Sequence, residues 1–302
     1  MRRYLIVLFS LLSLSASAQG VNDHTPNSRI AAMGGASVAA KGDAFAIFDN
    51  TASALMEYKS VQVAFSYAKF AGEQYSQNRM FAAGTYVRFA QKHALLAGAQ
   101  FNMEPTVGNS GRPGVQTFNL SYGYKINNSL SLAATARYHR GYGYMESAQN
   151  YNGGGADVAI YSVVPLSFKQ GATLNIGGKA AFDTPTCSQY GRYTFAIAAG
   201  IGLSIPFSDA HMLDFTSEIK YGAAKGGDII AARLGAEYSL MRLFYFRAGG
   251  NITHIAHNIT LPYGTVGLGV RFFHLQFDVA YIAGKRNTPL HNALQFNFGL
   301  DF

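Results

Sequence analysis

The sequence is poor in cysteine, in charge and in long apolar runs, and each shortage excludes a class of protein. Cys187 is the single cysteine of 302 residues, so the chain has no internal disulfide, and we interpret it as a structural or surface-loop residue. Charged residues make up 13% of the chain, about half of what a soluble domain carries. After residue 18 no run of eighteen apolar residues occurs, which excludes spanning helices. No Lys/Arg run follows either, which argues against nucleic acid as a partner.

The first eighteen residues have the organisation of a secretory signal peptide. Arg2 and Arg3 form a positive start, residues 4–14 are apolar, and Ala16-Ser17-Ala18 provides a small-residue cleavage site. No cysteine follows the cleavage site, so a lipoprotein is excluded. We therefore assign residues 1–18 to an export signal, and without its two arginines the net charge of +8 becomes +6.

What the sequence does contain is glycine and aromatic residues in unusual number. It has 33 glycines, 22 phenylalanines and 19 tyrosines, yet no apolar block. This composition is typical of a membrane β-barrel, in which only every second residue of a strand faces lipid.

Period-two alternation over about ten residues is the test of a barrel strand, and residues 193–205 pass it clearly. Small and polar residues occupy the even positions of this segment. The odd positions are Tyr193, Phe195, Ile197, Ala199, Ile201, Leu203 and Ile205. Similar alternation recurs at 213–221, 230–238, 275–281 and 294–302.

Counting all such segments predicts about fourteen strands. They lie near 60–70, 79–90, 92–102, 115–126, 129–140, 156–168, 171–183, 192–206, 210–222, 228–240, 242–253, 263–273, 274–284 and 291–302. An even count allows the sheet to close, and closure removes edges that lipid does not tolerate. We predict an all-β protein, a transmembrane antiparallel β-barrel of about 14 strands surrounded by the lipid of a bacterial outer membrane.

The connections between these segments alternate between short and long. Tight turns are expected near Gln91, Asn127-Asn128, Gln170-Gly171, Ser208-Asp209, Leu240-Met241 and Phe273-His274. The longer connections are 71–78, 103–114, 141–155, 184–191, 223–227, 254–262 and 285–290. Short turns on the periplasmic side and long loops outside are the usual asymmetry of outer-membrane barrels.

Residues 19–59 precede the first predicted strand and show no strand pattern. They are apolar, small and rich in turn residues, and they are too few for the large plug of an energy-coupled transporter. A fourteen-stranded barrel is too wide for its own side chains to fill. We therefore predict a hatch at residues 19–59, inside the lumen of a barrel formed by residues 60–302.

Part of this hatch resembles a known family. The residues that carry the resemblance are Ser28, Arg29, Met33, Gly34, Gly35 and Ala36, followed by Asp43, Ala44, Ala46, Phe48, Asn50 and Ala52. They resemble the N-terminal signature of the PorV/PorQ group, within the wider superfamily of FadL-like barrels. The sequence departs from that signature at Thr51, where the family usually has proline. Of these residues, Met33, Gly34, Gly35, Asp43, Phe48, Asn50 and Ala52 are our predicted hatch residues.

The resemblance implies one of two roles, and neither involves an enzyme or a cofactor. PorV/PorQ-like proteins act in type IX secretion or surface assembly, which implies a protein partner such as a secretion or surface-assembly component. FadL-like proteins instead admit hydrophobic small molecules. We take the secretion role as the main expectation and the transporter as the alternative.

Charged residues at predicted inward positions form a second group of candidates. They are Arg137, Lys179, Asp214, Glu218, Lys220, Arg233, Glu237, Arg247, Arg271 and Asp278. Both signs occur at similar depth, which favours a structural ion-pair network that braces the wall and the hatch; a polar pore is the alternative. Either arrangement weighs against a fatty ligand, because a greasy pocket needs an apolar lining.

Two further groups complete the candidate residues. Tyr142, Tyr144 and Tyr151 lie in the predicted outer loop 141–155, as a partner contact or as part of an aromatic girdle. Phe296, Phe298, Leu300 and Phe302 alternate with polar or small residues, and we predict that they form the signal read by the barrel-insertion machinery. No recognisable nucleophile, base and acid motif and no metal site is evident.

Overall fold

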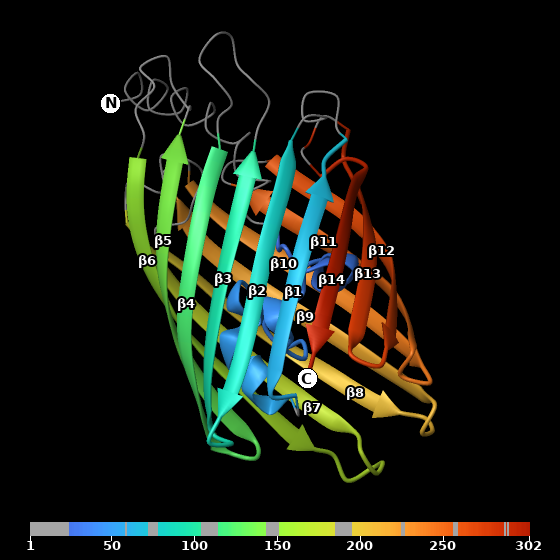
Figure 1. Cartoon of the computed structure of the whole chain (residues 1–302). Coiled ribbons are helices and arrows are strands. Elements are labelled where there is room, and N and C mark those ends of the chain that lie inside the picture. Colours follow the sequence, from blue (N-terminus) through green and yellow to red (C-terminus); the bar gives the residue numbers. More distant parts are fainter. Residues whose placement is uncertain are drawn as a thin grey trace, which may run out of the picture.

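The computed structural model describes residues 24–57, 59–71, 78–103, 114–142, 151–184, 195–224, 227–255, 259–286, 288 and 290–302. The signal segment 1–18, Tyr144 and Cys187 lie outside the described residues. Fourteen antiparallel strands close into one barrel, in which every strand pairs with its neighbours in the sequence and β1 pairs with β14 (Figure 1). The predicted all-β barrel is therefore confirmed.

The strands are long and continuous. Their bounds are β1 (Val61–Lys69), β2 (Arg79–Phe89), β3 (His93–Met103), β4 (Gly114–Asn127), β5 (Leu130–Tyr142), β6 (Tyr151–Pro165), β7 (Thr173–Asp183), β8 (Phe195–Pro206), β9 (His211–Ala224), β10 (Gly227–Leu240), β11 (Phe244–Ile255), β12 (Ile259–Phe272), β13 (Leu275–Gly284) and β14 (Ala293–Asp301). None of the helices in the described residues is long and apolar enough to cross a membrane.

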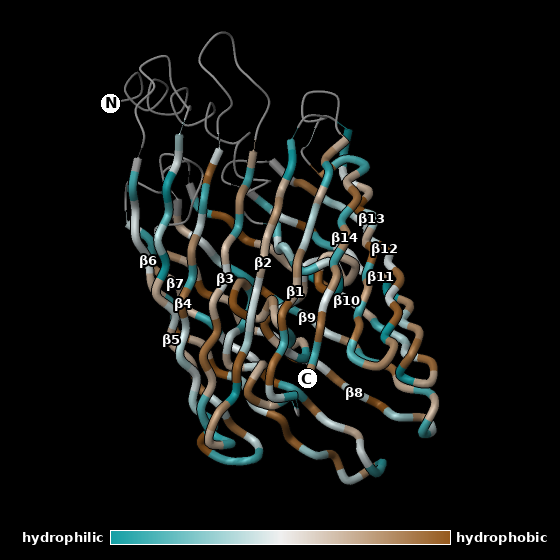
Figure 2. The backbone as a smooth tube through the Cα atoms, in the orientation of Figure 1, coloured by the Kyte–Doolittle hydropathy of each residue, from teal (hydrophilic) through white to brown (hydrophobic). Residues whose placement is uncertain are grey.

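Adjacent residues on a strand have opposite environments, as the period of two requires. Ile219 on β9 is 66% exposed, whereas the preceding Glu218 is 3% exposed. On β10, Leu234 is 65% exposed and Arg233 is 6% exposed. Hydrophobic and hydrophilic residues accordingly alternate along the strands in Figure 2. The wall therefore presents an apolar outer face, and the charged side chains of these strands point inward.

The structure corrects two predicted connections. The turn after β6 is not a tight turn at Gln170-Gly171 but extends over residues 166–172. Gly153, Gly154 and Gly155 belong to β6 and pair with His139, Tyr138 and Arg137, although we expected a loop there. The strand continues because inter-strand bonds join backbone groups, so a run of glycines does not prevent pairing.

The N-terminal segment, residues 24–57, lies inside the barrel (Figure 1). It contains α3 (Ser28–Ala32), η1 (Ala44–Ile47) and η2 (Thr51–Met56). Helix α3 packs against β11–β14, η1 against β1–β4, and η2 against β3–β6. The division of the chain into hatch and barrel as functional domains stays a prediction.

Polar side chains define where these short helices begin. The Asn27 side chain accepts hydrogen bonds from the backbone N–H groups of Arg29 and Ile30 at the start of α3. Asp43 accepts from Phe45 before η1, and Asn50 accepts from the Ala52 N–H before η2. Each cap satisfies a donor that the helix leaves without a partner.

Inward-facing glycines make room for the N-terminal segment. A Cβ on Gly249 would lie 2.2 Å from the carbonyl carbon of Met33, and one on Gly235 would lie 2.4 Å from the Met33 Cβ. On other strands, a Cβ on Gly177 would meet the carbonyl oxygen of Val38. The backbone of the segment thus contacts the wall directly, and no other residue fits at these positions without a shift.

Candidate functional site

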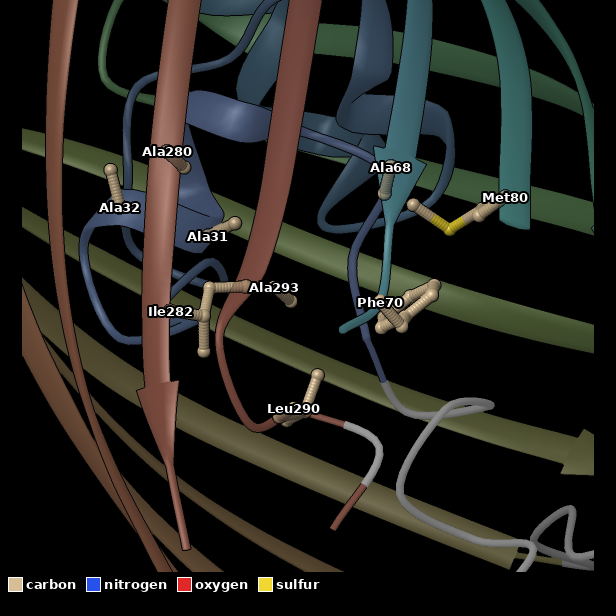
Figure 3. Close-up of a cluster of buried hydrophobic side chains, with 9 residues drawn as sticks. All are labelled: Ala31, Ala32, Ala68, Phe70, Met80, Ala280, Ile282, Leu290 and Ala293. Carbon is tan, nitrogen blue, oxygen red and sulfur yellow. The ribbon is translucent and has the colours of Figure 1, made fainter. Parts of the chain in front are cut away.

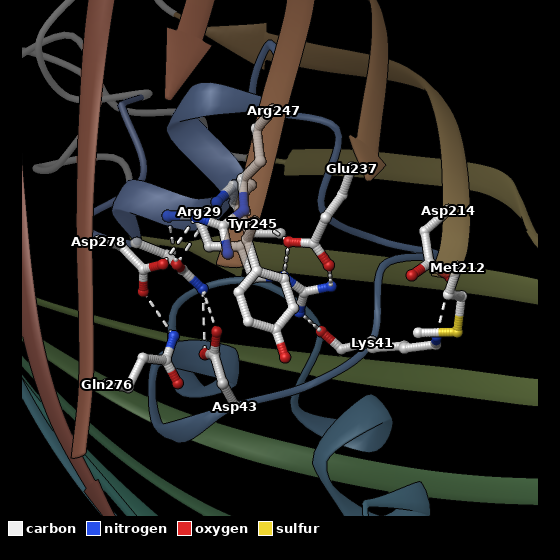
Figure 4. Close-up of polar contacts among 12 residues, drawn as sticks. Arg29, Lys41, Asp43, Met212, Asp214, Glu237, Tyr245, Arg247, Gln276 and Asp278 are labelled. Carbon is white, nitrogen blue, oxygen red and sulfur yellow. Dashed lines mark hydrogen bonds and ion pairs between the residues drawn. The ribbon is translucent and has the colours of Figure 1, made fainter. Parts of the chain in front are cut away.

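The most buried ion pairs of the lumen centre on Glu237 of β10. Its carboxylate accepts two hydrogen bonds from Arg29 of α3, from Nε at 2.8 Å and from Nη2 at 3.0 Å. Arg247 of β11 donates from Nε to the same carboxylate at 2.5 Å and from Nη1 to Asp278 of β13 at 2.7 Å. The four side chains form one chain of alternating charge that joins α3 to the wall (Figure 4).

Two further carboxylates of the wall bind the N-terminal segment. Glu218 of β9 accepts from the backbone N–H groups of Ser37 and Val38 at 2.7 and 2.9 Å and pairs with Arg233 at 2.9 Å. Asp214 pairs with Lys41 at 2.8 Å. The Glu218 contacts satisfy backbone donors that would otherwise be buried without partners, and together with the Lys41 ion pair they fix the segment in place.

A third group of charges lies nearer the long-loop end of the barrel. Arg137 pairs with Asp157 and, at 3.2 Å, with Asp183. His139 is fully buried and lies between Thr117, 3.1 Å from Nδ1, and Asp183, 3.2 Å from Nε2. This group cross-links β4, β5, β6 and β7.

A cavity of about 170 Å³ lies between this third group and the N-terminal segment. The apolar side chains of Ile47 and Phe48 line it together with Asp49, whereas Lys179 and Arg137 line its wall. The Lys179 ammonium donates to the Asp49 carbonyl at 2.6 Å. The cavity is therefore amphipathic: the segment contributes both apolar and polar side chains, and the strands contribute charged ones.

The Asp49 side chain gives this cavity a titratable group. Its carboxylate accepts a hydrogen bond from the Thr25 hydroxyl at 3.2 Å. Burial raises the pKa of Asp49 to about 7, and the neighbouring Asp43 charge adds to the shift. The carboxyl group is therefore partly protonated near neutral pH, which makes the cavity lining more positive as the pH falls.

Apolar side chains also form separate clusters in the lumen. Phe70, Met80, Ile282 and Leu290 form a buried cluster with several alanines, including Ala31 and Ala32 of the N-terminal segment (Figure 3). Further apolar clusters join η1 and η2 to β1–β6. Apolar clusters and groups of charged side chains thus both lie around the lumen, with apolar contacts on β1–β3, β5, β6, β13 and β14 and ion pairs on β5–β7, β9–β11 and β13.

The structure brings most of the predicted lumen charges together, but it adds partners that the sequence did not suggest. Arg29, Lys41, Asp157, Asp183 and His139 are the additions. Arg271 lies instead over the ring of Tyr245, 5.2 Å from its centroid. Partners from the N-terminal segment were missed because alternation assigns faces only to strand residues.

The predicted hatch residues have identifiable contacts. Met33 and Gly34 pack on Gly249, and the Gly35 carbonyl accepts from Arg233 at 3.2 Å. The Asn50 side-chain amide donates to the carbonyls of Val38 and Ile160. Asp43 accepts from Asn27, Phe48 lines the cavity, and Ala52 packs against Ala133, Ala159 and Tyr161.

Thr51, where the sequence departs from the family signature, occupies the first position of η2. Proline is favoured at this position of a helix because its missing N–H has no partner there. Threonine fits the same position, and its hydroxyl lies 3.1 Å from the Thr135 hydroxyl on β5.

Two of the tyrosines that we expected in an outer loop lie at the ends of strands. Tyr142 is the last residue of β5 and Tyr151 the first residue of β6. Among the described residues no group of three or more His, Cys, Asp or Glu side chains is arranged to hold a metal ion. Phe296, Phe298 and Leu300 lie on β14 and pair in register with Tyr67, Phe65 and Val63.

No protein-family model and no curated protein matches the chain. Among solved structures it resembles the CymD monoaromatic hydrocarbon channel, with a TM-score of 0.61 and 14% identity over 91% of this chain and 97% of that one. The Pseudomonas putida toluene transporter TodX gives a TM-score of 0.60 and 12% identity over 91% and 98%. A Pseudomonas aeruginosa FadL homologue gives 0.52 and 14% over 92% and 97%.

These likenesses show a FadL-like barrel, and a closed barrel of this fold places the chain in a bacterial outer membrane. They also correct our main functional expectation. We expected a PorV/PorQ-like secretion component, but the fold is that of hydrocarbon and toluene channels over nearly the whole chain. The secretion assignment was wrong because it rested on a short signature within one segment.

Proposed function

We propose that the chain is a non-enzymatic outer-membrane channel for small hydrophobic molecules. The observation that carries this proposal is the likeness of the whole barrel to channels described as carrying toluene or monoaromatic hydrocarbons. At this level of identity the likeness concerns the fold, so the substrate must be argued from the lumen itself.

The lumen supports a small hydrophobic substrate in two ways. A cavity of about 150 Å³ with an apolar lining is large enough to bind benzene in a protein interior. The lumen cavity measures about 170 Å³, so it is large enough for one aromatic ring, and Phe48 and Ile47 provide an apolar contact within a lining that also contains charged side chains such as Arg137 and Lys179. In addition, the N-terminal segment contacts the wall at inward glycines of several strands, so its backbone occupies part of the lumen.

Uptake by intact cells tests this proposal. The chain would be expressed in a bacterial strain that lacks its own channels for hydrophobic compounds. The initial rate of uptake of radiolabelled toluene would then be compared with that of a disaccharide. We expect toluene uptake to rise severalfold and disaccharide uptake to stay unchanged. Equal toluene uptake with and without the chain would refute the channel, and a rise in both solutes would indicate an open polar pore.

A substitution in the cavity makes the test specific. Phe48→Glu places a charge among the apolar lining residues, and we expect it to abolish the gain in toluene uptake. Leu120→Gln, on the lipid-facing side of β4, is the matched control. Folding of both variants is checked by the heat-dependent gel shift of membrane barrels.

A further inference from the structure

Five turn residues adopt a backbone conformation that their side chains disfavour. Met241 and Arg242 both have φ of 55°, Phe273 has φ of 53°, and Ala90 and Gln91 have φ of 47° and 60°. All five lie in the short turns at the periplasmic edge of the barrel, which we call the periplasmic rim. Left-handed backbone is strained for every residue except glycine and, to a lesser degree, asparagine and aspartate.

At other positions with a left-handed backbone, the chain has glycine or asparagine, the residues that this conformation favours. Gly171 and Asn292 have φ of 79° and 53°. The turn between β10 and β11 is a tight hairpin in which the Leu243 N–H donates to the Leu240 carbonyl at 3.0 Å. Both central residues of this hairpin, 241 and 242, have a left-handed backbone, and the sequence usually found at two such positions is Asn-Gly. Instead it carries Met241 and Arg242, so something outside the turn favours those two side chains.

Two of the three strained turns share a second feature, a large apolar residue followed by a basic one. The pairs are Met241-Arg242 and Phe273-His274, and Phe168-Lys169 repeats the pattern in the turn between β6 and β7. Met241 is 67% exposed, Phe273 is 84% exposed and Phe168 is 68% exposed. No such pair occurs at Ala90-Gln91, although that turn has the same strain.

Neighbouring turns extend the pattern along the rim. The Lys169 ammonium lies 5.0 Å from the ring centroid of Phe207 in the turn between β8 and β9. Phe272, the last residue of β12, is 58% exposed on the lipid-facing side, and Phe273 follows it directly. The apolar side chains of the rim therefore continue the lipid-facing belt of the barrel.

From these observations we propose that the periplasmic rim binds anionic phospholipid of the inner leaflet. The exposed Met241, Phe273 and Phe168 would enter the acyl boundary, while Arg242 and Lys169 meet the phosphates. An apolar side chain beside a cation matches the two parts of such a lipid. Contact with lipid also explains why large side chains persist where glycine or asparagine would relieve strain. This inference does not depend on what the channel carries.

Native mass spectrometry of the purified full chain tests the proposal directly. The protein in detergent would be titrated with equal amounts of phosphatidylglycerol and phosphatidylcholine. We expect the parent chain to bind phosphatidylglycerol in preference to phosphatidylcholine. The double variant Met241→Asn/Arg242→Gly should weaken phosphatidylglycerol binding roughly fivefold, the effect expected when one basic side chain near an anionic lipid is removed. Phosphatidylcholine binding should change much less.

The chain supplies a matched control. Ala90→Asn/Gln91→Gly relieves the same backbone strain but keeps the exposed Phe89 and Lys92 beside it, so it should leave phosphatidylglycerol binding unchanged. Both double variants should resist heating in detergent at least as well as the parent chain. Arg242→Gln removes only the charge and keeps Met241, so it should also weaken phosphatidylglycerol binding, but by no more than the double variant does. The proposal is overturned if both lipids bind equally, or if the variants at residues 241 and 242 keep full binding of phosphatidylglycerol.

Discussion

At the residue scale, Glu237 shows how the lumen tolerates charge without becoming a polar pore. The Glu237 carboxylate forms ion pairs with two buried guanidinium groups, those of Arg29 and Arg247. Arg247 also forms an ion pair with Asp278. A buried ion pair adds little stability relative to apolar residues, because desolvation offsets the attraction between the charges. Removing one partner is costly, however, because an uncompensated charge stays behind.

We therefore predict that Glu237→Gln destabilises the chain by about 3–5 kcal/mol, the usual cost of leaving a buried charge without its partner. Denaturant unfolding in detergent micelles measures this loss. Asp209→Asn, in an exposed turn, is the control and should change stability by less than about 0.5 kcal/mol. Equal effects of the two substitutions would show that the Glu237 pairs are dispensable.

At the scale of elements, the contact between the N-terminal segment and the strands depends on the absence of side chains. Gly249 is a clear case, because a Cβ there would meet backbone atoms of both Met33 and Gly34. Backbone atoms cannot rotate away as a flexible side chain can. The segment or the strand must shift to accommodate even one methyl group.

The matched pair Gly249→Ala and Gly264→Ala tests this contact. Overpacking of this kind costs about 1–3 kcal/mol, so Gly249→Ala should destabilise the chain and expose the segment to protease. Gly264, on the adjacent strand, has no atom within 4 Å of its Cβ position, and its substitution should be neutral or slightly stabilising. Protease sensitivity that is unchanged in Gly249→Ala would contradict the packing described here.

The same glycines explain what the sequence could and could not predict. Alternation such as that of 193–205 predicts each strand well, because lipid on one side imposes a strict period of two. The route of the N-terminal segment has no such period. Gly235 and Gly249 at inward positions do mark where that segment touches the wall, but the partner of each glycine is visible only in three dimensions. The ion pairs of Arg29 and Lys41 were hidden for the same reason.

At the scale of the whole molecule, the barrel depends on one long-range pairing. The first and last strands pair from Gln62 with Asp301 to Lys69 with Leu294. Phe302 extends this closure, because its carbonyl accepts from the N–H groups of Ser60 and Val61, and its own N–H donates to the Val61 carbonyl at 2.8 Å. Without closure both strands would present unpaired edges to lipid.

We predict that deletion of Phe302 lowers the amount of folded barrel in the outer membrane, measured by the heat-dependent gel shift of membrane fractions. The deletion removes both the backbone bonds and the ring, which stacks on His274 with centroids 5.3 Å apart. Phe302→Ala separates the two causes, because it keeps the backbone bonds and loses only the aromatic ring. A defect in both variants indicates that the insertion machinery reads the ring, whereas a defect in the deletion alone indicates that closure is limiting. Normal assembly of the truncated chain would exclude both roles for Phe302.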